Sequence, residues 1–303
     1  MGSDDYPRDL IGYGRNLPDP HWPGEARIAI CIAVNYEVGG ESSVLHGDSA
    51  SEFVLSDTPF PAYEGVRHEL VESAFEFGSR RGIWRLLDIL ESRDIRSNLF
   101  GVGMALERHP DVPLAFAEAG HEIVAHGYRW IDYREMSIEQ EREYMRRAIE
   151  AIERITGSRP TGWMTGRPSP NTRRLIVENG FSYDRDSLSD ELPYWVDVEE
   201  RPHLVVPYSF DANDMRYGTP GGFITGEDFY QYLKETFDQM YAEGETSPKM
   251  MSMAVHDRIV GRAGRANAFA RFLDYAQGHE GVWFATGNDI AEHWRTQYPY
   301  PSA

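Results

Sequence analysis

Short apolar segments alternate with amphipathic helical segments along most of the chain, and this alternation limits the fold more than any other feature. Strands and helices in regular succession are typical of a parallel sheet or barrel. The expected strands are residues 27–34, 97–102, 120–126, 162–165, 181–184, 203–208, 250–255 and 282–285. The expected helices are residues 79–91, 104–119, 137–155, 172–179, 227–243, 265–280 and 288–294. We therefore predict an α/β fold, a single distorted (β/α) barrel in which six or seven of these eight segments form parallel strands.

The bulk composition fits one domain without nucleic-acid or membrane partners. The chain has 303 residues, of which 41% are apolar, enough to fill a sizeable core. Residues 1–26 are rich in Pro, Gly and Asp, which predicts an extended N-terminal arm before a barrel domain at residues 27–303. The net charge of −19 disfavours nucleic acid and anionic membranes. The single Cys31 lies in an apolar run, and no apolar leader is visible, so we expect a cytoplasmic protein.

Polar clusters follow four of the expected strands. Asn35-Tyr36-Glu37 comes after the first strand, and His126-Gly127-Tyr128-Arg129-Trp130 comes after the third. Thr165-Gly166-Arg167-Pro168 follows the fourth strand, and His256 follows the seventh. The carboxyl ends of parallel barrel strands converge on one face, so these side chains are expected to meet there. A carboxylate, two histidines and an arginine in one place suit acid–base hydrolysis.

Longer strings of residues resemble a known family. Gly120-His121-Glu122-Ile123, Arg167-Pro168, Tyr183-Asp184 with Asp186, and the late strand ending in His256 resemble the polysaccharide deacetylase (NodB-homology) superfamily across residues 25–295. Within it the chain is most similar to the allantoinase branch. The strings that carry this second resemblance are Asp5-Tyr6-Pro7-Arg8-Asp9-Leu10-Ile11-Gly12-Tyr13-Gly14, His21-Trp22-Pro23-Gly24, Asn35-Tyr36-Glu37, His126-Gly127, Arg129-Trp130, Pro170-Asn171-Thr172-Arg173-Arg174-Leu175 and Asn213-Asp214-Met215-Arg216. The resemblance implies a NodB-type barrel that hydrolyses a carbon–nitrogen bond of a small cyclic amide or ureide, foremost allantoin to allantoate in purine catabolism.

The resemblance also raises the question of a metal ion. A typical deacetylase of this superfamily holds a divalent metal with one Asp and two His, the Asp directly following the catalytic base. Here the base position is Glu37, the next residue is Val38, and the partner position of His126 is Trp130. Since a catalytic zinc site normally needs about three protein ligands, we predict no metal and no other cofactor. His46 or His68 folding in from distant segments is the open alternative.

Each candidate residue receives a hypothetical role. Glu37 accepts a proton from water, with its pKa raised by a desolvated site. Arg167 binds a substrate carbonyl or orients Glu37, His256 protonates the departing nitrogen, and His126 hydrogen-bonds the attacked carbonyl or the water.

The expected substrate-binding residues are Asn35, Tyr36, Trp130 and Asp186, with the rings of Tyr36 and Trp130 walling a small flat ring. The basic run from Arg258 to Arg265 could contact an anion or a carboxylate.

Three interpretations of the function stay open from the sequence. The first is a metal-independent allantoinase, expected to be a homo-oligomer and foremost a tetramer. The second is a metal-dependent deacetylase of N-acetylated sugars or peptidoglycan, and the third is a catalytically inactive ligand-binding barrel. Asp257 beside His256, and Pro168 after Arg167, depart from the allantoinase pattern, so another cyclic imide or ureide is also an expected substrate class.

Overall fold

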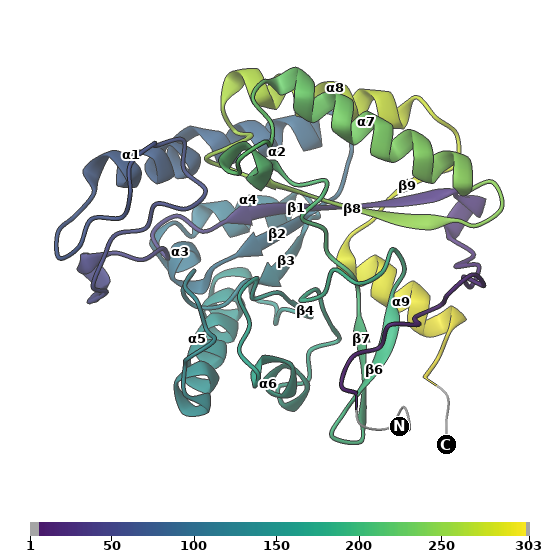
Figure 1. The fold of residues 1–303 in the computed structure, drawn as a ribbon, viewed down its shortest axis with the longest axis horizontal. Coiled ribbons are helices and arrows are strands. Elements are labelled where there is room, and N and C mark those ends of the chain that lie inside the picture. The colour runs from purple at the N-terminus through teal and green to yellow at the C-terminus, as the bar shows by residue number, and fades with distance from the viewer. Residues whose placement is uncertain (1–5, 301–303) are drawn as a thin grey trace.

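The computed structural model describes residues 6–300 and has one curled sheet with helices around its outside (Figure 1). The strand order is β6-β7-β5-β4-β3-β2-β1-β8, with β9 pairing β1, and all pairs are parallel except β6 with β7. The strands are β1 (Ile28–Tyr36), β2 (Asn98–Gly101), β3 (Glu122–Ala125), β4 (Gly162–Trp163), β5 (Tyr183–Asp184), β6 (Tyr194–Val198), β7 (Arg201–Val205), β8 (Lys249–His256) and β9 (Val282–Phe284). The predicted α/β barrel class is confirmed.

The predicted number of strands is too low. Within residues 6–300 the sheet has nine strands, eight of them running parallel and β6 antiparallel to β7. The strand without an expected counterpart is β6, Tyr194–Val198, whereas the two-residue strands β4 and β5 fall within expected segments. Between β7 and β8 the sheet stays open. There the chain from Ala212 to Asn213 lies along β8, and the amide of Ala254 donates to the carbonyl of Ala212 at 3.0 Å.

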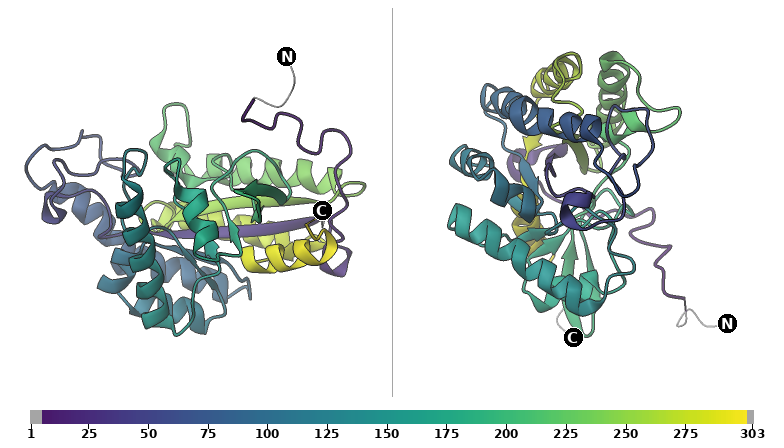
Figure 2. Two further views of the ribbon diagram at one scale, coloured as in Figure 1. Left: turned by 90° about the horizontal axis from the view of Figure 1, so that it is seen from below. Right: turned by 90° about the vertical axis from the view of Figure 1, so that its left-hand side faces the viewer.

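Helices cover the outer face of the sheet, as the right-hand view of Figure 2, along β1, shows. They are α1 (Glu69–Phe77), α2 (Ile83–Glu91), α3 (Gly103–Arg108), α4 (Asp111–Glu118), α5 (Ile138–Thr156), α6 (Thr172–Glu178), α7 (Gly226–Glu243), α8 (Ala263–Gln277) and α9 (Gly287–Gln297). A π-helical turn, Gly78–Gly82, joins α1 to α2. The expected helix at 104–119 is split into α3 and α4 around His109-Pro110, because proline cannot donate the backbone hydrogen bond that a continuous helix needs.

The alternation of side chains along the long strand β1 explains which residues point toward the candidate site. Side chains alternate between the two faces of a strand. Ile28, Ile30, Ile32, Val34 and Tyr36 belong to the core beneath the helices, while Ala29, Cys31 and Ala33 belong to clusters on the other face. Cys31 is a buried free cysteine, as its apolar surroundings predicted. Odd-numbered positions therefore face the interior of the curled sheet, and Asn35 does so at the carboxyl end.

The described part of the N-terminal arm packs at the opposite end of β1. Trp22 is buried against Trp283 and Trp294, with ring centroids 5.6 and 6.3 Å away, and its indole N–H donates to the carbonyl of Lys249. Figure 1 shows this arm near the start of β1 and the irregular segment 41–68 at the far end. Residues 1–5 of the predicted arm lie outside the described residues. Among residues 6–300, no helix combines the length and apolar character needed to cross a membrane.

Candidate active site

Three predicted residues meet at the carboxyl ends of β1, β3 and β8. Glu37 Oε1 lies 3.2 Å from His126 Nε2 and 3.6 Å from His256 Nε2. All three are buried, with 1%, 4% and 4% of their surface exposed. The three strands run parallel and pair in one sheet, which is why residues 89 and 219 positions away from Glu37 reach the same carboxylate.

The backbone fixes the ring of His126. Its Nδ1 lies 2.7 Å from the carbonyl oxygen of Met164, so this nitrogen donates its proton there. Its Nε2 faces the carboxylate of Glu37, which also accepts. Both hydrogen bonds form together only when both ring nitrogens carry a proton. In that form His126 presents a donor to any oxygen that enters the space beside Glu37.

His256 has a carboxylate partner that the sequence analysis did not assign. Its Nδ1 lies 2.6 Å from Asp214 Oδ1, and Asp214 Oδ2 accepts the backbone N–H groups of His256 and Val260. Burial lowers the pKa of His256, but the negative charges of Asp214 and Glu37 outweigh it, so the pKa is raised above its usual value. Asp214 belongs to one of the strings that resemble the allantoinase branch, so a signal was present without a role.

Arg258, not Arg167, contacts the carboxylate of Glu37. Arg258 Nη2 donates to Glu37 Oε2 at 2.6 Å, and both side chains are buried. Burial raises the pKa of Glu37, but Arg258, His256 and His126 together hold it well below its usual range. The predicted upward shift is wrong, because the sequence could not show how many positive groups would surround this carboxylate.

Arg167 does not contact the carboxylate of Glu37. Its guanidinium stands 4.4 Å from the ring centre of Trp130, and it is half-buried. Within residues 6–300 its side chain makes no hydrogen bond, so it does not orient Glu37. The other predicted role, binding a substrate carbonyl, stays a prediction. Trp130 itself joins the two arginines, since the guanidinium of Arg258 lies 5.0 Å from its ring centre.

The other predicted binding residues divide between the two faces of β1. Asn35 faces inward, where its amide donates to the carbonyl of Val255 at 3.3 Å. Tyr36 faces outward, and its hydroxyl contacts Ser79 Oγ at 2.8 Å and His109 Nδ1 at 3.1 Å. The structure therefore does not bring Tyr36 to the wall of the site beside Glu37, because neighbouring positions on a strand point to opposite faces.

Asp186 lies at a hollow next to His126. Its carboxylate accepts the backbone N–H groups of Thr165 and Gly166 at 2.8–3.0 Å. Burial and the nearby Asp184 raise its pKa to about 6. The hollow, of about 250 Å³, is lined by Met164, Gly166, Pro168, Arg185, Asp186, Ser187, Leu188 and Phe210. A methyl group on Gly166 would lie 3.7 Å from the ring of His126, so Gly166, which lines the hollow, is a neighbour of His126.

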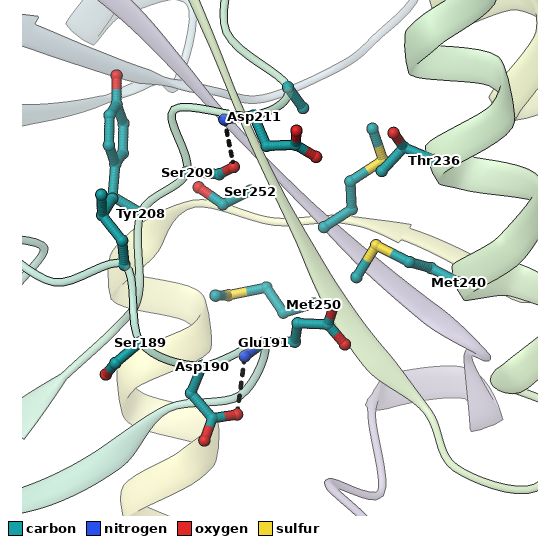
Figure 3. A pocket seen from close by; sticks show the side chains of 13 residues that line it. Ser189, Asp190, Glu191, Tyr208, Ser209, Asp211, Thr236, Met240, Met250 and Ser252 are labelled. Carbon is teal, nitrogen blue, oxygen red and sulfur yellow. Dashed lines mark hydrogen bonds between the residues drawn. The ribbon is translucent and has the colours of Figure 1, made fainter. Parts of the chain in front are cut away.

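A larger cavity of about 340 Å³ lies on the open side of the sheet, between β8 and the loops that follow β5 and β7 (Figure 3). Methionine side chains and the carboxyl groups of Asp190, Glu191 and Asp211 line it. Glu37, His126 and His256 are not among its lining residues. They are not among the lining residues of the smaller hollow either, so the candidate site is defined by their contacts with one another at the carboxyl ends of β1, β3 and β8.

The residues at the metal positions do not fit a metal ion. Val38 offers no ligand atom, and Trp130 places an aromatic ring where a second imidazole would stand. The guanidinium of Arg258 already provides a positive charge beside Glu37. His46 bonds the carbonyl of Glu41 and His68 stacks on Tyr63, so neither replaces the missing ligands. Among residues 6–300 no group of three or more His, Cys, Asp or Glu is arranged to hold a metal.

Comparisons with known proteins identify the family of the chain. Residues 65–183 match the family model described as polysaccharide deacetylase. A Schizosaccharomyces pombe protein named "Putative polysaccharide deacetylase" is 37% identical, covering 97% of this chain and 98% of that one. The crystal structure of Puue allantoinase is 52% identical with a TM-score of 0.96, covering 98% of this chain and 100% of that one. A structure titled probable polysaccharide deacetylase, from Pseudomonas aeruginosa PAO1, is 53% identical with a TM-score of 0.95 and the same coverage. The chain therefore belongs to the polysaccharide deacetylase family.

Proposed function

We propose that the protein hydrolyses a carbon–nitrogen bond in a cyclic amide or ureide, and that its substrate is allantoin, opened to allantoate. The observation that carries the proposal is the ionised Glu37 held between two histidines with no metal-ligand set around it. The likeness to Puue allantoinase, at 52% identity over 98% of this chain, supports the substrate.

The geometry supports a reaction in which protein groups do all the proton transfers. A water molecule beside Glu37 Oε1 gives a proton to the carboxylate as its oxygen attacks the ring carbonyl. The N–H of His126 stabilises the oxygen that becomes negative. His256, kept protonated by Asp214, then gives its proton to the ring nitrogen as the carbon–nitrogen bond breaks. The product carries a carboxylate where the ring amide was.

The binding residues receive matching roles. The ring of Trp130 and the guanidinium above it, from Arg167, form a flat polar surface for a planar ureide. Asp186 at the adjacent hollow offers a carboxyl group to N–H donors of the substrate.

The second candidate is a metal-dependent deacetylase of N-acetylated sugars or peptidoglycan. The names of the family model and of the S. pombe relative favour it. Val38 and Trp130 argue against it, because they replace two of the three ligands that such an enzyme needs. A hydrolase of another cyclic imide keeps the proposed chemistry, and Asp257 and Pro168 beside the site are the residues that would adapt it.

A coupled assay for allantoate, run with and without a strong chelator, separates these candidates. We expect ring opening at the same rate in both conditions, because no step uses a metal ion. Acetate release from N-acetylglucosamine oligomers that stops on chelation would establish the deacetylase instead. Tight binding of allantoin without turnover would identify an inactive binding protein.

Replacing Asp214 with asparagine is expected to change the pH dependence of the reaction. His256 must be protonated to donate, so activity is present below its pKa and is lost as the pH rises through it. Removing the negative charge lowers that pKa, which moves the alkaline limb of kcat/KM down by about one pH unit or more. Rate profiles from pH 5 to 10 check this, and an unmoved alkaline limb would show that Asp214 does not act through His256.

A further inference from the structure

Arg258 is buried at the centre of the candidate site, where two of its three guanidinium nitrogens are hydrogen-bonded and Nη1 has no hydrogen-bond partner among residues 6–300. Its exposed fraction is 2%. Its Nη2 donates to Glu37 Oε2 at 2.6 Å and its Nε donates to the carbonyl of Leu55 at 2.8 Å. Its guanidinium lies 4.3 Å from the ring centre of Phe75 and 5.0 Å from that of Trp130, and these two rings pack against each other with their centres 6.1 Å apart. A buried cation is costly unless it is paired, so this arrangement is built around its contact with Glu37.

The backbone that carries Arg258 is fixed by unusually close packing. A methyl group on Gly78 would lie 2.6 Å from Asp257 Cγ, and one on Gly82 would overlap the carbonyl oxygen of Asp257. Only glycines in the π-helical turn Gly78–Gly82 therefore allow the chain at residues 257–258 to come this close. The turn and the end of β8 together set where the guanidinium stands.

The two oxygens of Glu37 have separate partners as a result. Oε2 is taken by Arg258, and Oε1 is left facing Nε2 of both His126 and His256. A carboxylate with one oxygen anchored cannot rotate freely, so the second oxygen stays where a water must be bound and deprotonated. The remaining ionisable neighbours of Glu37 are Asp257 and Tyr208.

We propose that Arg258 is the positioning residue of this site: its guanidinium anchors Glu37 by one oxygen and supplies the fixed positive charge that a metal-dependent site takes from its ion. This inference rests on the proposed function. The planar guanidinium is suited to the task, because its separate N–H groups bond the carboxylate of Glu37 and the carbonyl of Leu55 in fixed directions while it lies beside two aromatic rings. We expect lysine, whose compact ammonium lacks this fork of donors, to replace it only in part.

The test compares Arg258→Met and Arg258→Lys with a control, Arg271→Met. Arg271 in α8 also pairs with a glutamate, Glu227 at 2.8 Å, and its guanidinium lies 4.1 Å from the ring centre of Tyr230. At neutral pH we expect Arg258→Met to lose about 100-fold or more in kcat/KM. Arg258→Lys should recover part of that loss, and Arg271→Met should stay near the wild-type rate.

The pH profile separates positioning from a merely structural effect. In the wild type, Glu37 stays ionised far into the acidic range. Without the guanidinium, Arg258→Met should gain an acidic limb above the usual value of about 4.3 for a glutamic acid. Lysine keeps a positive charge, so Arg258→Lys should not gain that limb. A lower rate with an unchanged profile in Arg258→Met, or identical profiles for the methionine and lysine variants, would overturn the proposal.

A substrate-free measurement keeps this test independent of the proposed function. The infrared band of a protonated carboxyl group should appear at higher pH in Arg258→Met than in the wild type, and should vanish when Glu37→Gln is added. If the wild type does not open allantoin but this band behaves as expected, only the assigned substrate fails. If the band does not move, the role of Arg258 fails. If Arg258→Met does not fold, the carboxyl band is measured in Arg258→Lys instead. The proposal expects this band at the same pH as in the wild type, and its appearance at a higher pH would refute the proposal.

Discussion

Replacing Glu37 with glutamine is expected to lower kcat/KM for allantoin opening about 1,000- to 10,000-fold, at the upper end of what a general base contributes. The amide has nearly the same shape as the carboxylate but cannot take a proton from water. It also presents an N–H group to a site whose neighbours, Arg258 and the two histidines, are all donors. Allantoate formation by the variant and the wild type, at equal folded concentration, measures the loss.

A matched control exists for this substitution. Glu141 in α5 is as buried as Glu37, and its carboxylate accepts the hydroxyl groups of Ser169 and Thr172. Hydroxyl groups can turn to accept as well as donate, so Glu141→Gln should keep activity close to the wild type. Turnover by Glu37→Gln within tenfold of this control would remove Glu37 from the role of base.

The positions of the catalytic candidates along the chain were predictable, but their mutual contacts were not. Glu37, His126 and His256 end strands with clear apolar runs, so their meeting place follows from a parallel sheet. Arg167 and Arg258 both follow strands, and nothing in the sequence tells which of them reaches Glu37. Arg258 reaches it beside Asp257, against which Gly78 and Gly82, from a distant segment of the chain, pack closely.

The placement of Tyr36 could have been predicted from the sequence. Glu37 and Asn35 flank it on a strand, so if they face the site, Tyr36 must face the helices. By contrast, the pairing of His256 with Asp214 spans 42 residues and a short 3₁₀ turn, Asp214–Gly218, that has no hydrophobic period to reveal it. The conformation of loops that close a site is determined by tertiary contacts, and such contacts leave no local pattern in the sequence.

The missed strand β6 has a local cause. It forms a hairpin with β7 through Glu199 and Glu200, which have positive φ values of 51° and 63°. Turns of this kind are usually marked by Asn or Gly, because other residues adopt positive φ only at a cost. Two glutamates give no turn signal, so the segment was expected to be a loop. Asp197 supports the turn by accepting the backbone N–H of Glu200.

Replacing His256 with glutamine is expected to lower kcat/KM about 100- to 1,000-fold and to abolish the alkaline limb of its pH profile. Glutamine can still donate a hydrogen bond to the departing nitrogen but has no proton to give up, so the nitrogen must leave as an anion or wait for solvent. In the wild type the rate falls as the pH rises through the raised pKa of His256. Once this group is gone, no ionisation at that position limits the rate.

His203 provides the control for this prediction, because it is also a buried histidine paired with an aspartate, Asp184, at 3.0 Å. It lies in β7 and does not contact Glu37, so His203→Gln should lower stability while leaving the alkaline limb in place. If that limb persists in His256→Gln, the titrating acid is another group, and His126, with its second nitrogen tied to the carbonyl of Met164, becomes the donor to test. Nδ1 of His256 is held by the carboxylate of Asp214, whereas Nδ1 of His126 is held by a backbone carbonyl. The alkaline limbs of His256→Gln and of a matching His126→Gln variant therefore decide which imidazole carries the proton to the leaving nitrogen.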